Sequence, residues 1–144
     1  MKKIIFLIFI SLIVFNVSVL AQSDELVNVC ALDIGDATYL KDFKIKLQQG
    51  DIKPAPSAKF SVVLNKGTTY KLNVCNAEGY EGEAIIKLLD NNNLLGTNYS
   101  SSTAKFYKGI QFPCTKTGVY TINVSFKDGK EGAAVAILSF MNKK

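Results

Sequence analysis

The chain has 144 residues, a mean hydropathy of +0.16 and a formal net charge of +5 at pH 7, and it contains no Arg, His or Trp. Without His it cannot build a Ser-His-Asp triad, a Cys-His catalytic pair or an imidazole metal site. Without Arg it lacks the planar donor that reads phosphate and guanine, so nucleic-acid recognition is disfavoured.

The first 21 residues have the three parts of a secretory signal peptide. A positive start at residues 2–3 precedes an apolar run over 4–14, and Val19 and Ala21 occupy the small-residue positions before a cleavage point at Gln22. The alternative is a retained membrane anchor, for which the apolar segment is marginal, since a span needs about 20 apolar residues. We therefore expect a secreted or periplasmic protein, without stable membrane insertion once the leader is cleaved.

The region after the leader, 22–144, has the size of a single domain with a core of its own. Its 15 lysines stand against 12 acidic residues, which leaves a net charge of +3. A balance of this size favours solubility and is not a nucleic-acid signature.

Most of this region alternates between apolar and polar residues, the period of half-buried β-strands. No run in it has the 3.6-residue period of an amphipathic helix. Two further runs are apolar on both faces and predict central strands, at 84–89 and 133–141. The alternating runs lie at 43–47, 60–64, 70–74 and 120–126.

Short polar turns separate these runs and predict an antiparallel β-sandwich of about eight or nine strands. The turns lie at 65–67, 90–93, 116–118 and 127–130. Asp128-Gly129 is typical of a type I′ turn and predicts a hairpin that joins 119–126 to 132–141. Lys44 and Lys46 share the outward side of their strand, which is typical of an edge strand protected from aggregation.

Two stretches repeat one phrase: "GTTYKLNVC" at 67–75 and "TGVYTINVS" at 117–125. In each, a tyrosine enters a strand just after a turn and points to the core side. A tyrosine at such a corner buries its ring while its hydroxyl reaches nearby backbone. We interpret Tyr70 and Tyr120 as two solutions of one structural problem rather than as a duplicated functional motif.

Three cysteines in an exported chain predict one disulfide and one unpaired thiol. Of the three pairings, we favour Cys75 with Cys114, on the argument that their strands are neighbours. Cys30 would then be free or would form a covalent dimer. Three thiols without CxxC spacing or His disfavour a zinc site, so we expect no metal and no other cofactor.

The order "FSVVLNKGTTYKLNV", "AIIKLLDNNNLLG", "FPCTKTGVYTINVSF" and a final apolar strand, over 58–141, resembles bacterial pre-peptidase C-terminal (PPC)-type domains and Golgi-dynamics-type jelly-roll sandwiches. The resemblance implies a sandwich of jelly-roll type and a non-catalytic role, because such domains are usually appendages of secreted proteins. This chain departs from that arrangement, because no catalytic domain accompanies the sandwich.

Three tyrosines in or beside loops, Tyr80, Tyr99 and Tyr107, are the candidates for contact with a ligand. They lead to one alternative function, a carbohydrate-binding module. Asn98-Tyr99-Ser100 and Asn123-Val124-Ser125 also match the N-glycosylation pattern, which has meaning only in a host that glycosylates such sites.

A second alternative, a small carboxylate-dependent hydrolase, would use Glu78, Glu81 or Glu83, although a solvated acidic loop explains the same residues. Asp and Asn at 89–93 could hold Ca²⁺, but a hairpin turn explains them equally well. We conclude for a secreted, non-enzymatic binding or accessory module of the cell envelope or extracellular space, with a protein or glycan partner that the sequence does not identify.

Overall fold

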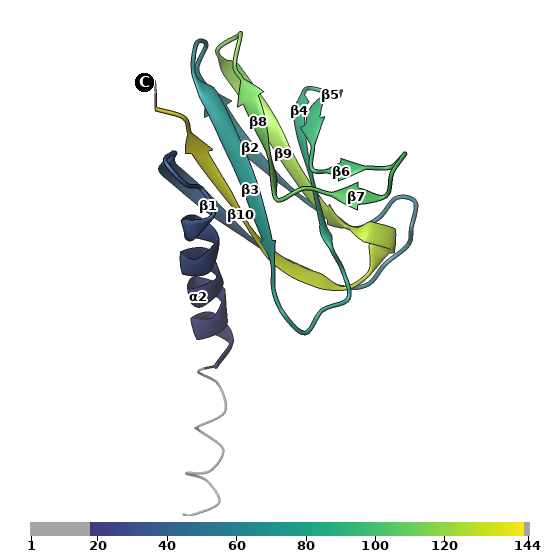
Figure 1. Ribbon diagram of the computed structural model, residues 1–144. Helices are drawn as coiled ribbons and strands as arrows, with labels where there is room; N and C mark the ends of the chain where they lie inside the picture. Colours follow the sequence, from purple (N-terminus) through teal and green to yellow (C-terminus); the bar gives the residue numbers. More distant parts are fainter. Residues whose placement is uncertain (1–17, 143–144) are drawn as a thin grey trace, which may run out of the picture.

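The computed structural model describes residues 18–142, and for 18–22 only the backbone. Most of the predicted leader, 1–17, lies outside the described residues. One helix precedes ten strands in the part of the chain that is described (Figure 1). The elements are α2 (Ser18–Leu32), β1 (Thr38–Leu47), β2 (Ser57–Leu64), β3 (Thr69–Asn76), β4 (Ala84–Asp90), β5 (Asn93–Thr97), β6 (Tyr99–Ser100), β7 (Lys105–Phe106), β8 (Gly109–Pro113), β9 (Gly118–Phe126), the 3₁₀ turn Lys127–Gly129 and β10 (Gly132–Phe140).

Eight of the strands form two four-stranded sheets that pack face to face. The first sheet has the order β1-β10-β3-β8 and the second has the order β2-β9-β4-β5, while β6 and β7 form a separate two-stranded ribbon. Every pairing among these strands is antiparallel. The predicted all-β antiparallel sandwich is confirmed.

The pairing is nested, and this identifies the topology as a jelly roll. The first long strand pairs with the last (β1 with β10), the second with the last but one (β2 with β9), then β3 with β8, and β4 with β5. At the centre of this nest Asp90 pairs with Asn93, and Asn91 has a φ of 53°. The turn predicted at 90–93 is therefore confirmed as the hairpin about which the chain doubles back.

The hairpin predicted at Asp128-Gly129 is wrong. Both residues have the left-handed φ that the pattern indicates, 59° and 66°. However, β9 pairs with β2 and β4, whereas β10 pairs with β1 and β3, so this turn carries the chain from one sheet to the other. A Cβ on Gly129 would lie 2.3 Å from the carbonyl oxygen of Asp51, so glycine allows this crossing to lie against the β1–β2 connection.

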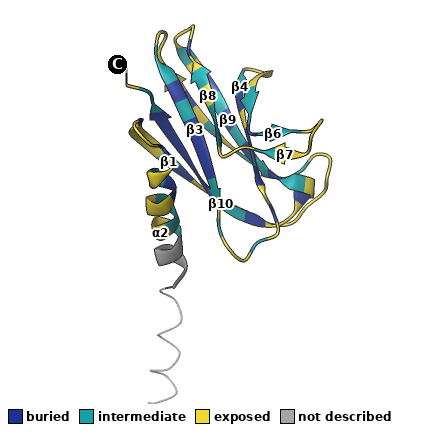
Figure 2. Cartoon of the chain, viewed as in Figure 1, coloured by how far each residue is buried: buried dark blue, intermediate teal, exposed yellow. Residues whose placement is uncertain are grey.

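The core lies between the two sheets and uses the alternate side chains that the period-two pattern predicts (Figure 2). In β9, for example, Tyr120, Ile122, Val124 and Phe126 are buried while the residues between them are exposed or half-buried. β10 is buried on both faces, as its sequence predicts, because α2 packs on the outer side of Val135 and Ile137.

Helix α2 was not predicted. Its sheet-facing positions Leu26, Val27, Cys30 and Ala31 do recur at helical spacing, but they make only a short stripe directly after the leader. The helix runs across the predicted cleavage point at Gln22. No helix in the described part of the chain is long and apolar enough to cross a membrane.

β1 is an edge strand of the first sheet, as its outward lysines indicate. Lys44 on this strand forms an ion pair with Asp24 of α2, and this hydrogen bond raises the pKa of Lys44. The edge strand thus also helps to hold the helix.

The two tyrosines of the repeated phrase are buried and serve the same structural purpose. The backbone N–H of Asn65 donates to the Tyr70 hydroxyl at 2.9 Å, and the Tyr120 hydroxyl donates to the carbonyl of Lys116. Each tyrosine therefore fastens the turn that precedes its own strand, one in each sheet, and the structural interpretation of the repeat is confirmed.

Replacing either Tyr70 or Tyr120 with Phe should lower the free energy of unfolding by about 1 kcal/mol, because a partner at the turn loses its hydrogen bond. Tyr39→Phe is the matched control: its hydroxyl bonds Asp42 at the surface, so the change should stay within about 0.5 kcal/mol. Urea unfolding at pH 7 measures all three, and equal effects from the three variants would contradict this role.

Burial, with Cys114 and Asp90 nearby, raises the pKa of Tyr120 above its ordinary value of 10.0. The folded state therefore favours the protonated phenol, and this contribution to stability is complete below pH 10 and lost as the pH rises through the folded pKa. Between pH 9 and 11.5 the stability of Tyr120→Phe should fall less steeply than that of the unchanged protein. Parallel curves would contradict the assignment.

Candidate binding surface

The disulfide joins Cys30 to Cys75, with their Cα atoms 5.7 Å apart, and Cys114 is free and buried. The predicted Cys75–Cys114 pair is therefore wrong. The dimer through Cys30 fails with it, because Cys30 is already bonded and has no exposed surface. The bond ties α2 to β3 on the outer side of the first sheet.

The register of the two strands explains the error. β3 and β8 are neighbours, as the prediction assumed, but Thr69 pairs with Pro113, so Cys114 lies beside the start of β3. Cys75 is six residues further along the same strand, a distance of roughly 20 Å at the rise of a β-strand. The two thiols also face opposite sides of the sheet, since Cys114 belongs to the core between the sheets and Cys75 packs beneath α2.

Cys114 packs beside the turn that Tyr120 stabilises, just before β9. Its sulfur lies 3.2 Å from the carbonyl oxygen of Lys116 and 3.7 Å from the Tyr120 hydroxyl. A buried thiol placed among such partners acts as a packing residue.

Peptide mapping by mass spectrometry of the unreduced protein should recover Cys30 linked to Cys75, with Cys114 alkylated only after denaturation. Cys30→Ala/Cys75→Ala should lower the free energy of unfolding by about 2–4 kcal/mol, since the bond closes a long loop. Cys114→Ala is the control that leaves the bond intact. A linked Cys75–Cys114 peptide would contradict the structure.

Of the three candidate tyrosines, Tyr99 lies in β6 and Tyr107 directly follows β7, so two of them belong to the β6–β7 ribbon and its end. The rings of Tyr99 and Phe106 stack with their centroids 4.6 Å apart. Tyr107, the next residue, is 50% exposed, and the Lys105 ammonium lies 5.1 Å from the centre of its ring. Tyr80 lies apart from this ribbon, in the β3–β4 loop, with Lys46 of β1 over its ring.

Asn98 fixes the ribbon to the sandwich, a role that the sequence did not reveal. It is 1% exposed, its Oδ1 accepts from the backbone N–H of Ile86, and its Nδ2 donates to the carbonyls of Ala84 and Tyr107. Its amide is therefore enclosed by backbone in the folded chain, which does not suit a glycosylation acceptor. The pattern Asn-Tyr-Ser gave no sign of this role.

A pocket of about 180 Å³ lies beside the ribbon, where β3 and β4 diverge. Val74 and Ala84 supply its apolar floor, and Phe106 and Tyr107 line its side. Glu83 and Lys108 bring one charge of each sign to it, and Lys108 also pairs with Asp33 at 3.7 Å. The ribbon thus presents an exposed aromatic ring next to a small pocket of mixed polarity.

The glutamates of the β3–β4 loop do not form a catalytic arrangement. Glu78, Glu81 and Glu83 are all exposed, and Glu81 pairs with Lys130 at 3.2 Å in solvent. Asp90 of the 89–93 turn pairs with Lys116. In the described residues no three Asp, Glu, Cys or His side chains gather in a group that could hold a metal ion.

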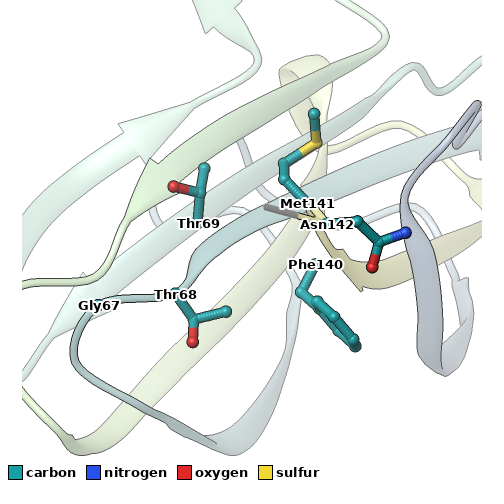
Figure 3. Close-up of a pocket in the computed structure, with 6 residues that line it drawn as sticks. All are labelled: Gly67, Thr68, Thr69, Phe140, Met141 and Asn142. Carbon is teal, nitrogen blue, oxygen red and sulfur yellow. The ribbon is translucent and has the colours of Figure 1, made fainter. Parts of the chain in front are cut away.

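A second hollow, of about 410 Å³, lies where β3 begins and β10 ends (Figure 3). Among the residues up to Asn142 that the structure describes, no ionisable side chain lines it. The Asn142 side chain at its edge is engaged by Thr38 and by the carbonyl of Asp36. Its polar groups therefore serve to hold the end of β10.

No protein-family model matches the chain. Among solved structures it is similar to PliG of Aeromonas hydrophila, a periplasmic lysozyme inhibitor of g-type lysozyme, with a TM-score of 0.53, 11% identity and coverage of 72% of this chain and 88% of that one. It is also similar to the pre-peptidase C-terminal domain of a collagenase from Bacillus anthracis, with a TM-score of 0.52, 16% identity and coverage of 70% and 89%.

One curated protein, an epimerase family protein of Mycobacterium leprae (strain TN), is 24% identical over 108 residues. The match covers 75% of this chain and 34% of that protein, so the chain spans about a third of its length. The solved structures support the resemblance to pre-peptidase C-terminal domains at the level of the fold, and fold alone does not assign a ligand.

Proposed function

We propose that this chain is an exported, non-catalytic module that binds a protein partner through the β6–β7 ribbon and the pocket beside it. The observation that carries the proposal is the half-exposed ring of Tyr107 at the edge of a small pocket that is lined by both apolar and polar side chains. Aromatic anchors beside pockets of this kind supply much of the energy of protein–protein interfaces.

The surroundings of Tyr107 suit such a contact. Asn98 anchors the ribbon through three hydrogen bonds, so the ring is presented by a fixed backbone and loses little freedom on binding. Phe106 is held by its stack on Tyr99 and lines the pocket next to the exposed ring. Glu83 and Lys108 can fix the orientation of a partner at the rim.

Two further features support export and a binding role. The Cys30–Cys75 disulfide suits an oxidising compartment and agrees with the signal-peptide pattern of residues 1–21. One protein with a similar fold is a periplasmic inhibitor of a lysozyme, which shows that this fold can serve as a protein ligand rather than as an enzyme.

The test is a cross-linked pull-down from the native exported fraction, with Tyr107→Ala as the variant. Loss of the ring should weaken capture of a stoichiometric partner by at least about tenfold. Tyr39→Ala is the matched control, because Tyr39 is a similarly exposed tyrosine on β1. It should capture the partner normally, and both variants should keep the unfolding free energy within about 0.5 kcal/mol of the parent.

Equal capture by the two variants would refute the ribbon as the contact surface. Recovery of polysaccharide alone, lost in Tyr107→Ala, would replace the protein partner with a glycan bound through the tyrosines.

A further inference from the structure

In the part of the chain that the structure describes, no helix packs on the outer side of the second sheet, in contrast to that of the first. α2 contacts β10, β3 and β1 of the first sheet. On the second sheet the outward side chains of β2 are exposed, whereas those of β9 are half-buried except for the exposed Val119. We call this side the open face, and its centre is formed by Lys59, Ser61, Lys87, Thr97, Thr121 and Asn123.

The strand register places four of these residues in one row. Lys59 pairs with Asn123, Asn123 pairs with Lys87, and Lys87 pairs with Thr97. Two lysines thus flank one amide across three neighbouring strands, with their Cα atoms about 10 Å apart from the spacing of strands in a sheet. Ser61 and Thr121 face each other in the adjoining row and add two hydroxyls.

The charge of this row is not neutralised. The outward positions of β2, β9 and β4 carry no acidic side chain. Within the described residues, Lys59 and Lys87 have no carboxylate within 4.0 Å, whereas four other lysines do: Lys44, Lys108, Lys116 and Lys130. A face with this charge is complementary to a ligand that carries anions at intervals.

Asn123 lies between the two lysines, and its side-chain oxygen lacks a hydrogen-bond donor among the described residues. This oxygen is also shielded from solvent. A shielded acceptor without a donor costs free energy, which a hydroxyl or N–H from a ligand would recover. The side chains of Lys59 and Lys87 on either side of Asn123 are exposed.

We propose that the open face binds an acidic polysaccharide, a class that carries carboxylates and hydroxyls along one chain. Carboxylates of sugar acids pair with Lys59 and Lys87, whose spacing is comparable to one disaccharide unit of an extended chain. A sugar hydroxyl between them donates to Asn123, and others bond to Ser61 and Thr121. This site is separate from the ribbon around Tyr107 and does not depend on it, so one module can hold a glycan and a protein together.

Affinity electrophoresis of the exported protein through gels that contain polygalacturonate tests the site. The unchanged protein should be retarded, and Lys59→Ala/Lys87→Ala should bind about tenfold more weakly. Lys53→Ala/Lys66→Ala is the matched control, because it removes the same charge from exposed positions outside the open face. It should change retardation less than twofold.

Polyglutamate, a carboxylate polymer without hydroxyls, separates sugar recognition from attraction between charges. It should retard the protein less than polygalacturonate does, and Asn123→Ser should weaken only the binding of the sugar polymer. No retardation by polygalacturonate, equal retardation by the two polymers, or equal losses in the two lysine double variants would each overturn the proposal. The Tyr107→Ala variant should bind the polysaccharide normally, which keeps this test distinct from that of the ribbon.

Discussion

The nested pairing of strands is the constraint on which the rest of this structure depends. Because the chain doubles back at Asn91 and each early strand pairs with its counterpart in the late half, residues far apart in sequence become neighbours in a fixed register. The pairing puts Lys59, Asn123 and Lys87 in one row and sends consecutive strands β9 and β10 to opposite sheets. The apolar side chains between the sheets then supply the driving force that keeps this register, since a slip of one residue would turn them outward.

Helix α2 and the Cys30–Cys75 bond make the two outer faces unequal. The outer side of β10 is apolar, and Val135 and Ile137 are buried because the helix lies over them. The disulfide fixes the helix to β3, and the Lys44–Asp24 pair holds it to the edge strand. Among the described residues no helix covers the second sheet, and its outward positions combine hydroxyls, amides and lysines with apolar side chains such as Val63 and Val119. The proposed glycan site lies on that uncovered sheet, and the ribbon lies beside it as a second surface.

Much of the sandwich was predictable, because its strands are half-buried. In such strands, as in β9, apolar and polar residues alternate along the sequence. The turn at 90–93 and the corners at Tyr70 and Tyr120 were predictable too, since each is decided by a few adjacent residues. The Asp128-Gly129 turn was misjudged because its local geometry is the same whether the next strand joins the same sheet or the other one. The prediction of the cysteine pairing failed for a related reason. β3 and β8 are neighbours as expected, but the register of their pairing decides which residues lie opposite each other.

The candidate sites also include some features that the sequence predicts and others that only the structure shows. That Tyr99 and Tyr107 would lie at the rim followed from their place among turn residues. That Asn98 would be buried did not, because its three partners come from two distant backbone segments. The sequence did not single out Lys59 or Lys87, and Lys87 lies in a run predicted to be apolar on both faces; only the sheet order shows that β2, β9 and β4 place the two lysines around Asn123.

The proposed glycan site depends on α2 covering one sheet and leaving the other open, and rates of lysine acetylation in the folded protein test that arrangement most directly. Lys71 donates to the carbonyls of Asp33 and Ile34 just beyond the helix, at 3.3 and 3.2 Å, whereas Lys59 and Lys87 have exposed side chains. Under limiting reagent, read out by peptide mass spectrometry, Lys59 and Lys87 should react severalfold faster than Lys71. Protection of Lys59 and Lys87 together with a freely reactive Lys71 would contradict the account, because it would mean that the covered and open faces had been assigned the wrong way round.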